Sequence, residues 1–118
     1  MEKSYRDLNA WKYAFELVTL VYKVTERFPS TETYRLTSQM CSAAISVTAN
    51  IAEGSCRGTD KDFCRFLYMA RGSAAELENY ILVSERLGYI DSACRDELMS
   101  LTKNVGKTIN GLIKYLNR

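Results

Sequence analysis

The side chains that could carry catalysis or bind a metal are few in this sequence. It contains no histidine, so a serine or cysteine nucleophile would lack the imidazole base that usually activates it. A carboxylate-bridged metal pair inside a helical bundle would need Glu-x-x-His motifs on two helices. Glu53, Glu76 and Glu78 could offer an oxygen-only site, but Glu76 and Glu78 would point to different faces of one helix. The sequence therefore predicts no catalytic site, no metal and no cofactor.

Four cysteines are the remaining candidate ligands. They are Cys41, Cys56, Cys64 and Cys94. They form no Cys-x-x-Cys pair, and a zinc site would have to be assembled from separate helices. Reduced thiols packed within the protein are the simpler interpretation. With no signal peptide and no apolar run long enough to span a bilayer, these thiols predict a cytoplasmic protein that does not contact a membrane.

A stripe of polar residues follows one side of the helix expected between residues 36 and 54. Its members are Gln39, Ser42, Ser46, Asn50, Glu53 and Arg57. The stripe fits an acid–base site, a hydrogen-bonded network that fixes the register of the helices, or a solvated or subunit-facing side. We expect a structural network formed by Trp11, Gln39, Ser46, Asn50, Glu53 and Glu76.

Basic residues gather in two places. From residue 98 onwards there is no acidic side chain, while cations recur at steps of four, seven and four, which puts them on one helix face. These candidate nucleic-acid contacts are Lys103, Lys107, Lys114 and Arg118. A second, smaller cluster consists of Arg57, Lys61 and Arg65. The net charge of +2 does not by itself indicate a polyanion partner, and an ordinary solvated helix face can carry the same pattern.

These side chains must be positioned by helices, because apolar residues recur at steps of three and four in four segments. The first segment, residues 8–25, is expected to face the core with Leu8, Trp11, Phe15, Val18, Tyr22 and Thr25. The second, residues 36–51, is expected to do so with Leu36, Met40, Ala43, Val47 and Ile51. The third and fourth segments are residues 63–84 and 98–116. Short turns make successive helices antiparallel, so we predict an all-α fold, an antiparallel up-down-up-down four-helix bundle, as a single domain over residues 1–118.

Residues that favour helix ends separate the four segments. The candidate N-terminal caps, in chain order, are Asp7, Ser30 or Thr31, Thr59 and Asp91. Gly54 and Gly88 are expected to end the second and third helices in the left-handed conformation.

The positions of the turns predict which residues meet. A turn centred at Ser30 brings Trp11 towards Asn50, and a turn centred near Tyr89 sets Gly72 opposite Gly106. Glycine inside a helix costs about 1 kcal/mol relative to alanine. We therefore expect this glycine pair to permit a close approach of two helices.

Short motifs in a fixed order run through most of the chain. They are Asp7-Leu8 with Trp11; Phe28-Pro29 with Glu32, Tyr34, Leu36 and Gln39; Asn50-Ile51-Ala52-Glu53-Gly54 with Arg57; Ala70-x-Gly72-Ser73-x-x-Glu76-Leu77; and Leu87-Gly88-Tyr89-Ile90. In these motifs the chain resembles the bacterial rRNA intervening-sequence four-helix-bundle proteins. That family usually has Arg-Arg-Ala near residue 41, where this sequence has Cys41-Ser42-Ala43.

The resemblance implies a four-helix bundle that assembles into rings, typically homopentamers. Some members are encoded inside insertions in large-subunit rRNA genes, and relatives are retroelement accessory proteins that bind nucleic acid and a reverse transcriptase. We therefore expect a non-enzymatic homo-oligomer, a pentamer, that binds RNA or DNA, structured RNA above all, through its basic surface. Exposed aromatic residues such as Tyr13 and Tyr34 would belong to the subunit interface.

Two other hypotheses stay open on the sequence. The first is a structural or protein-interaction scaffold that docks a protein partner and binds no nucleic acid. The second is an enzyme that uses Glu53 or Glu76 as an acid or base.

Overall fold

The computed structural model describes residues 4–118. This part of the chain forms four α-helices, which are α1 (Asn9–Thr25), α2 (Leu36–Ser55), α3 (Asp60–Arg86) and α4 (Ser92–Leu116). The 3-10 segment η1 (Tyr5–Asp7) precedes α1, and η2 (Ser30–Glu32) lies in the turn between α1 and α2. Residues 4–118 contain no strand, and none of their helices is both long and apolar enough to cross a membrane.

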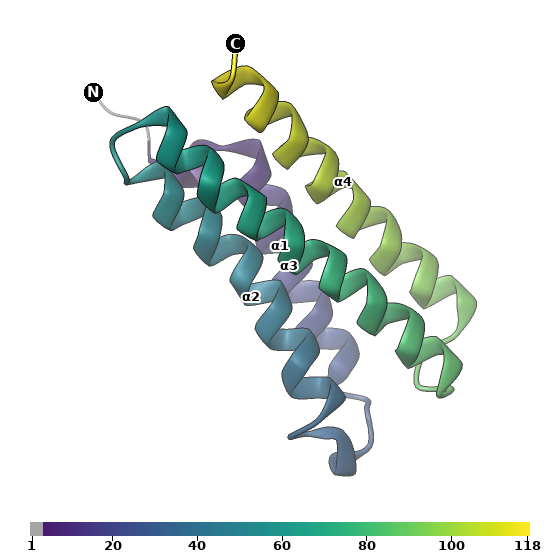
Figure 1. Cartoon of the computed structure of the whole chain (residues 1–118). Helices are drawn as coiled ribbons and strands as arrows, with labels where there is room; N and C mark the ends of the chain where they lie inside the picture. The colour runs from purple at the N-terminus through teal and green to yellow at the C-terminus, as the bar shows by residue number, and fades with distance from the viewer. Residues whose placement is uncertain (1–3) are drawn as a thin grey trace.

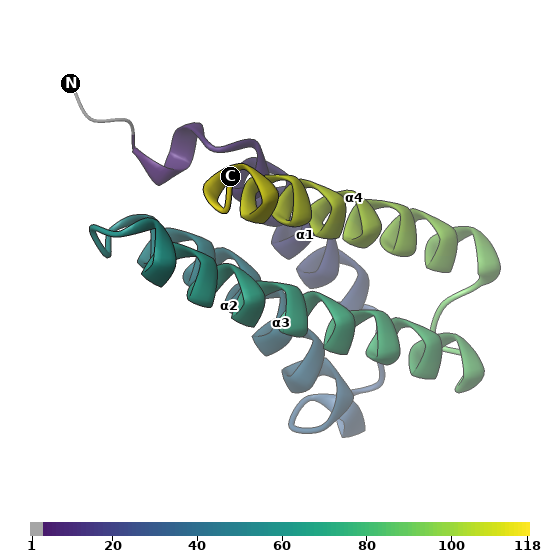
Figure 2. The same cartoon turned by 45° about the horizontal axis from the view of Figure 1, so that its top comes forward.

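The four helices lie side by side in an elongated bundle of 45 × 23 × 21 Å (Figure 1). Each helix packs against the next one in the chain, and α4 also packs against α1. Within the described residues, the diagonal pairs α1–α3 and α2–α4 are not neighbours, as the rotated view also indicates (Figure 2). The C-terminal end of α4 and the α2–α3 turn lie at one end of the bundle, and the other two turns lie at the opposite end (Figure 1). The predicted all-α, antiparallel up-down-up-down four-helix bundle is confirmed.

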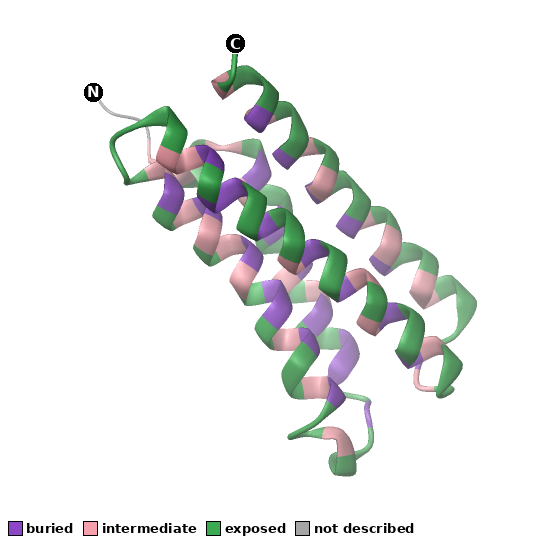
Figure 3. Ribbon diagram, viewed as in Figure 1, coloured by how far each residue is buried: buried purple, intermediate pink, exposed green. Residues whose placement is uncertain are grey.

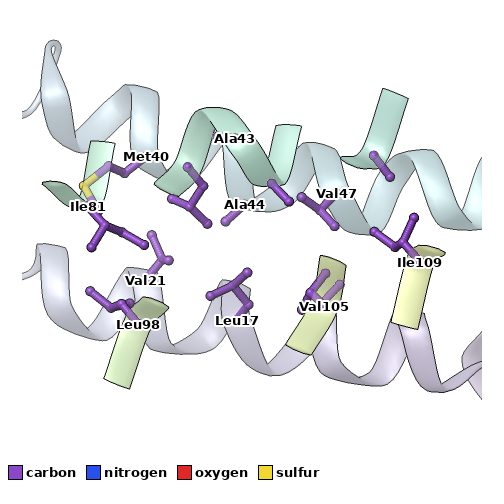
Figure 4. Packing of buried hydrophobic residues seen from close by; sticks show 14 of the residues in the cluster. Leu17, Val21, Met40, Ala43, Ala44, Val47, Ile81, Leu98, Val105 and Ile109 are labelled. Atoms are coloured by element: carbon purple, nitrogen blue, oxygen red, sulfur yellow. The ribbon is translucent and has the colours of Figure 1, made fainter. Parts of the chain in front are cut away.

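Buried residues recur along all four helices (Figure 3), and their apolar side chains fill the space between the helices (Figure 4). The largest fully buried side chains include Leu17, Met40, Ile51, Leu67, Leu77, Ile81, Leu98 and Ile109. Polar groups in this core are satisfied locally. The hydroxyl of Ser84 donates to the carbonyl of Tyr80 at 2.8 Å, and that of Thr102 donates to the carbonyl of Leu98 at 2.6 Å. The apolar stripe predicted for the second helix is buried throughout.

The face that α1 turns to the core differs from the predicted one. Its buried side chains are Ala10, Ala14, Leu17, Val21, Val24 and Thr25. Of the predicted stripe, Phe15 is 53% exposed and Tyr22 45% exposed, and Trp11 and Val18 are half-buried. The helix carries two adjacent apolar stripes, and both have the helical period. The stripe with small alanines lets α1 approach its neighbours closely, so the bulky aromatic stripe is left outside.

Three of the predicted helix ends are confirmed. The hydroxyl of Thr59 accepts a hydrogen bond from the amide N–H of Asp62 at 3.2 Å. The carboxylate of Asp91 accepts one from the amide N–H of Cys94 at 2.8 Å. Gly88 has a φ of +81°, and the amide of Tyr89 donates back to the carbonyl of Ser84 at 3.0 Å. This is the Schellman arrangement that satisfies the last carbonyls of a helix.

The starts of α1 and α2 differ from the prediction. Asp7 lies in η1, and Leu8, directly before α1, makes no capping hydrogen bond with its side chain. Ser30 and Thr31 lie in η2, so α2 begins later than expected. The carboxylate of Glu32 accepts the first amide of α2 at 3.3 Å in their place. The longer α1–α2 turn shifts the register between these two helices.

The predicted roles of the helical glycines are also corrected. Gly54 lies inside α2, where an added Cβ would be only 2.7 Å from the Cβ of Phe66 in α3. An added Cβ at Gly72 or Gly106 would meet no atom within 4 Å. The glycine that permits a close approach of two helices is therefore Gly54, because the Gly72 and Gly106 backbones do not face a neighbouring helix at short range. The left-handed glycine of the α2–α3 turn is Gly58, with a φ of +92°.

Candidate nucleic-acid interface

Three of the four predicted C-terminal cations lie on the solvent side of α4, and the fourth lies two residues beyond the end of the helix. They are Lys103, Lys107, Lys114 and Arg118, and all four are exposed. The buried residues of α4 recur on the opposite side of the helix, because both sets follow the helical period. None of the four cations forms an ion pair with another residue in the range 4–118. At about 1.5 Å per residue, the three lysines of this α4 stripe span roughly 17 Å of the helix.

The second predicted cluster lies where α2 ends and α3 begins. The guanidinium groups of Arg57 and Arg65 lie 4.7 Å and 4.8 Å from the centre of the Phe66 ring. Arg57 also pairs with Glu53 at 3.5 Å, and Arg65 pairs with Asp62 at 3.6 Å. Both pairs are largely exposed, so they contribute little to stability. Lys61, one turn before Arg65, is exposed.

The fold places the second cluster and the C-terminal end of the α4 stripe at the same end of the bundle (Figure 1). An open groove of about 620 Å³ lies between the start of α3 and the end of α4. It is lined by Lys61, Asp62, Cys64, Arg65, Tyr68, Leu116 and Asn117. The thiol of Cys64 donates to the side-chain oxygen of Asn117 at 3.5 Å, which ties the two helices together here. We call the surface formed by Arg57, Lys61, Arg65, Lys114 and Arg118 the basic end.

Two tyrosine–arginine pairs in this region are absent from the sequence-based prediction. The guanidinium of Arg71 lies 4.8 Å from the centre of the Tyr68 ring and also donates to Asn110 of α4 at 3.0 Å. The guanidinium of Arg118 lies 3.9 Å from the centre of the Tyr115 ring. Both tyrosines are about half exposed. The spacing of three residues within each pair is a signal in the sequence, since such residues are neighbours on a helix.

The residues around Asn50 do not form the predicted network with α1. The amide of Asn50 donates to the carbonyl of Ser46 in its own helix at 2.8 Å, and Trp11 stacks on a ring of its own helix. The reason is the longer α1–α2 turn. The hydroxyl of Thr25 lies 3.6 Å from the thiol of Cys41, and this register places Trp11 beyond Asn50, towards the end of α2.

The other predicted network members lie at the surface and make separate contacts. Glu53 pairs only with Arg57 along its own helix. The side chain of Gln39 accepts from the hydroxyl of Tyr80 at 3.3 Å, which is a link between α2 and α3. Glu76 is exposed on α3. The polar stripe of α2 is therefore a solvent-facing side of the isolated chain rather than a buried network.

A second surface is apolar and lies along α1 and α2. It consists of Trp11, Phe15, Tyr22, Tyr34 and Ile45, which we call the α1–α2 apolar face. Tyr34 is 94% exposed. Tyr22, Tyr34 and Ile45 line one open groove of about 530 Å³ together with small side chains of α2. Phe15 and Tyr22 are two of the α1 residues that we predicted from the sequence to face the core.

Tyr13, the other aromatic predicted at an interface, is partly exposed but lies elsewhere on α1. It is about 200° around the helix from Phe15. It is therefore not part of the α1–α2 apolar face.

The cysteines are free thiols in different surroundings. Cys64 is buried, Cys41 and Cys94 are half-buried, and Cys56 is exposed. Burial, with a smaller effect of the nearby Asp91 carboxylate, raises the pKa of the Cys94 thiol. In residues 4–118, no group of three histidine, cysteine, aspartate or glutamate side chains is arranged to hold a metal ion.

Polar contacts at the end opposite the basic end join neighbouring elements. The phenol of Tyr89 donates to Glu32 at 2.8 Å, and this hydrogen bond raises the pKa of Tyr89. Hydrogen bonds to Asp96 and then to Glu85 raise the pKa of Arg95. The Arg95–Glu85 contact, 2.9 Å long, holds α4 to α3. These contacts join elements at the end of the bundle that holds the α1–α2 and α3–α4 turns (Figure 1).

Comparisons with known proteins agree with the architecture. The family model described as 23S rRNA-intervening sequence protein matches residues 6–111. A crystal structure of a protein of unknown function from the S23 ribosomal protein family of Bacteroides thetaiotaomicron is similar in fold, with a TM-score of 0.74 and 21% sequence identity. The alignment covers 89% of this chain and 94% of that one. A comparison with curated proteins finds no match.

Proposed function

Since the chain belongs to the 23S rRNA-intervening sequence protein family, we propose that it acts by binding rather than by catalysis. In this proposal it is a cytoplasmic homo-oligomer, a pentamer, that binds nucleic acid, structured RNA above all, through its basic end and the α4 stripe. The free cysteines suit the reducing environment of the cytoplasm. The pentamer is what the resemblance of the sequence motifs implies.

The observation that carries the proposal is that two basic clusters far apart in the sequence are placed at the same end of the bundle (Figure 1). Lys61 and Arg65 of α3 line the same groove as Leu116 and Asn117, and Lys114 and Arg118 lie next to these two residues in the chain. A net charge of +2 is weak when it is spread over the whole surface. Cations gathered at one end, and continued by Lys103 and Lys107 along α4, offer several phosphate contacts at once.

The α1–α2 apolar face supports self-association. Phe15 and Tyr22 are exposed on the same side of α1, two turns apart. A groove lined by Val18, Tyr22 and Ile45 runs between α1 and α2. Contiguous exposed apolar surface of this kind marks interaction sites in proteins. In a ring, each subunit would repeat its basic end, and several weak contacts on one RNA would reinforce each other through effective concentration.

The RNA part of the proposal is tested by charge reversal. The variant Lys103→Glu/Lys107→Glu/Lys114→Glu is compared with a control that reverses Lys12, Arg35 and Arg86, which are exposed cations outside α4. Both variants lower the net charge by the same amount. We expect the α4 variant to lose binding to a labelled RNA hairpin in fluorescence anisotropy, and the control to keep most of it. Equal losses for the two variants, or no binding by the parent at low salt, would overturn the proposal.

The alternative function, a protein-interaction scaffold, is favoured by the same apolar face. The double variant Phe15→Glu/Tyr22→Glu is compared with Leu82→Glu/Leu87→Glu, two similarly exposed leucines of α3 and its C-terminal end. Under the proposal, light scattering finds an oligomer for the parent and the leucine variant, and a species near 13.5 kDa for the α1 variant. A parent that is monomeric at micromolar concentration would point to a scaffold whose apolar face takes a different partner.

A further inference from the structure

The groove at the basic end combines an aromatic ring, apolar surface and cations in one place. Its lining residues come from the first turns of α3 and the last turn of α4. The volume of about 620 Å³ lies within the range of sites that hold a small organic ligand. The phosphate-binding role in the proposed function uses only the cations, so it leaves the ring and the apolar surface unexplained.

Tyr68 is a ring that the protein holds in position while leaving it open. Its side chain is 46% exposed and lines the groove. The guanidinium of Arg71 lies 4.8 Å from the ring centre, and Asn110 of α4 fixes that guanidinium by a hydrogen bond of 3.0 Å. An aromatic ring held in this way offers a surface on which a flat ligand can stack, and stacking on such rings is how bases of unpaired strands are bound.

The other groove residues suit the remaining parts of a nucleotide. Leu116 adds apolar surface from α4, and Lys61 and Arg65 supply positive charge from two turns and one turn before Tyr68, respectively. Asp62, the acidic residue in the groove, is paired with Arg65 at 3.6 Å. The oxygen of the Asn117 amide accepts from Cys64, so its nitrogen remains a donor for a base edge.

We propose that this groove binds an unpaired nucleotide of an RNA strand, with the base stacked on Tyr68 and the adjacent phosphates at Lys61 and Arg65. The inference rests on the proposed function and deepens it, because it assigns unpaired RNA rather than duplex as the preferred ligand of the basic end. Bases inside a duplex are stacked on their neighbours on both faces, so their rings cannot reach Tyr68. The α4 stripe, in contrast, contacts phosphates of either kind of strand.

The test compares three probes and three proteins in fluorescence anisotropy titrations. The probes are an eight-nucleotide oligo(A), an abasic eight-nucleotide RNA with the same number of phosphates, and a 12-base-pair RNA duplex. The proteins are the parent, Tyr68→Leu, which keeps an apolar side chain but removes the ring, and Tyr68→Phe, which keeps the ring. Circular dichroism melts establish that all three are folded.

The parent should bind oligo(A) more tightly than the abasic strand. Tyr68→Leu should weaken oligo(A) binding by roughly 5- to 150-fold, which corresponds to the ~1–3 kcal/mol that stacking on one ring contributes per base. Its affinity for the abasic strand and for the duplex should stay at the parent level, and Tyr68→Phe should behave like the parent.

Failure of this inference differs from failure of the proposed function. If the parent binds RNA but Tyr68→Leu has no effect, or weakens all three probes equally, the groove is not a base site and the proposed function stands. If the parent binds none of the probes at low salt, both are overturned.

Discussion

Gly54 and Gly72 both lie inside helices, and replacing each with alanine tests how closely α2 and α3 pack. At Gly54 an added methyl carbon would lie 2.7 Å from the Cβ of Phe66, 3.0 Å from a ring carbon of Phe63 and 3.3 Å from the Phe63 carbonyl oxygen. The first and last of these neighbours cannot rotate away, so α2 must move from α3. At Gly72 the same methyl group would meet no atom within 4 Å.

The two substitutions should therefore change stability in opposite directions. Alanine in place of glycine favours a helix by about 0.5–1 kcal/mol, and at Gly72 this gain is realised in full. At Gly54 the contact of 2.7 Å with a fixed Cβ atom puts the cost of overpacking in the upper half of its usual range, at about 2–3 kcal/mol. The net loss is then about 1–2.5 kcal/mol. For a domain of this size we expect Tm to fall by roughly 4–8 °C for Gly54→Ala and to rise by roughly 2–4 °C for Gly72→Ala.

Thermal melts followed by circular dichroism measure both values, at one protein concentration because self-association shifts Tm. A Gly54→Ala variant that melts at or above the parent temperature would refute the close packing of α2 on α3. A Gly72→Ala variant that melts lower would show that the outer side of α3 is covered by another subunit, contrary to our placement of the subunit interface on α1 and α2.

Three further predictions follow from single contacts. Tyr89→Phe removes the hydrogen bond to Glu32 and should lower Tm at neutral pH. The pKa of Tyr89 is raised in the folded state. The parent is therefore more stable than the variant below about pH 10, and this difference in stability is lost as the pH rises through the folded pKa. The Tm values of the two proteins should converge in alkali. Asp91→Ala removes the side-chain cap of α4 and should cost about 1 kcal/mol in urea unfolding, with Asp91→Ser close to the parent. A maleimide should label Cys56 first and Cys64 last in the native protein, since Cys56 is exposed and Cys64 buried, and the reverse order in mass spectrometry would contradict the placement of α3.

Local rules predicted much of the fold because they depend on neighbouring residues. The caps at Thr59 and Asp91 and the left-handed Gly88 follow from residue type and position alone. The face of α1 could not be predicted in this way, because two apolar stripes share the helical period. The choice between them depends on the shape of the three other helices, and the side with Ala10 and Ala14 packs closer.

The candidate site shows the same division between local and long-range information. The spacing of charges identified both basic clusters, but their placement at the same end of the bundle depends on how α3 and α4 fold back on each other (Figure 1). The stacking of Arg71 on Tyr68 spans three residues of one helix, so the sequence did contain a signal for it. The expected link between Trp11 and Asn50 failed because η2 lengthens the α1–α2 turn, and nothing in the apolar pattern indicates that extra length.

The most direct test of the central claim is the salt dependence of RNA binding by the parent and by Lys103→Glu/Lys107→Glu/Lys114→Glu. Each phosphate contact by a cation contributes a slope of roughly 0.7–0.9 in a plot of log affinity against log salt concentration. If the α4 stripe contacts RNA phosphates, the affinity of the parent for an RNA hairpin should fall steeply with salt. The slope for the variant should be smaller by at least about 2, which corresponds to the loss of roughly three phosphate contacts. A parent whose affinity does not change with salt, or a variant with the parent's slope, would contradict the claim that this surface binds nucleic acid.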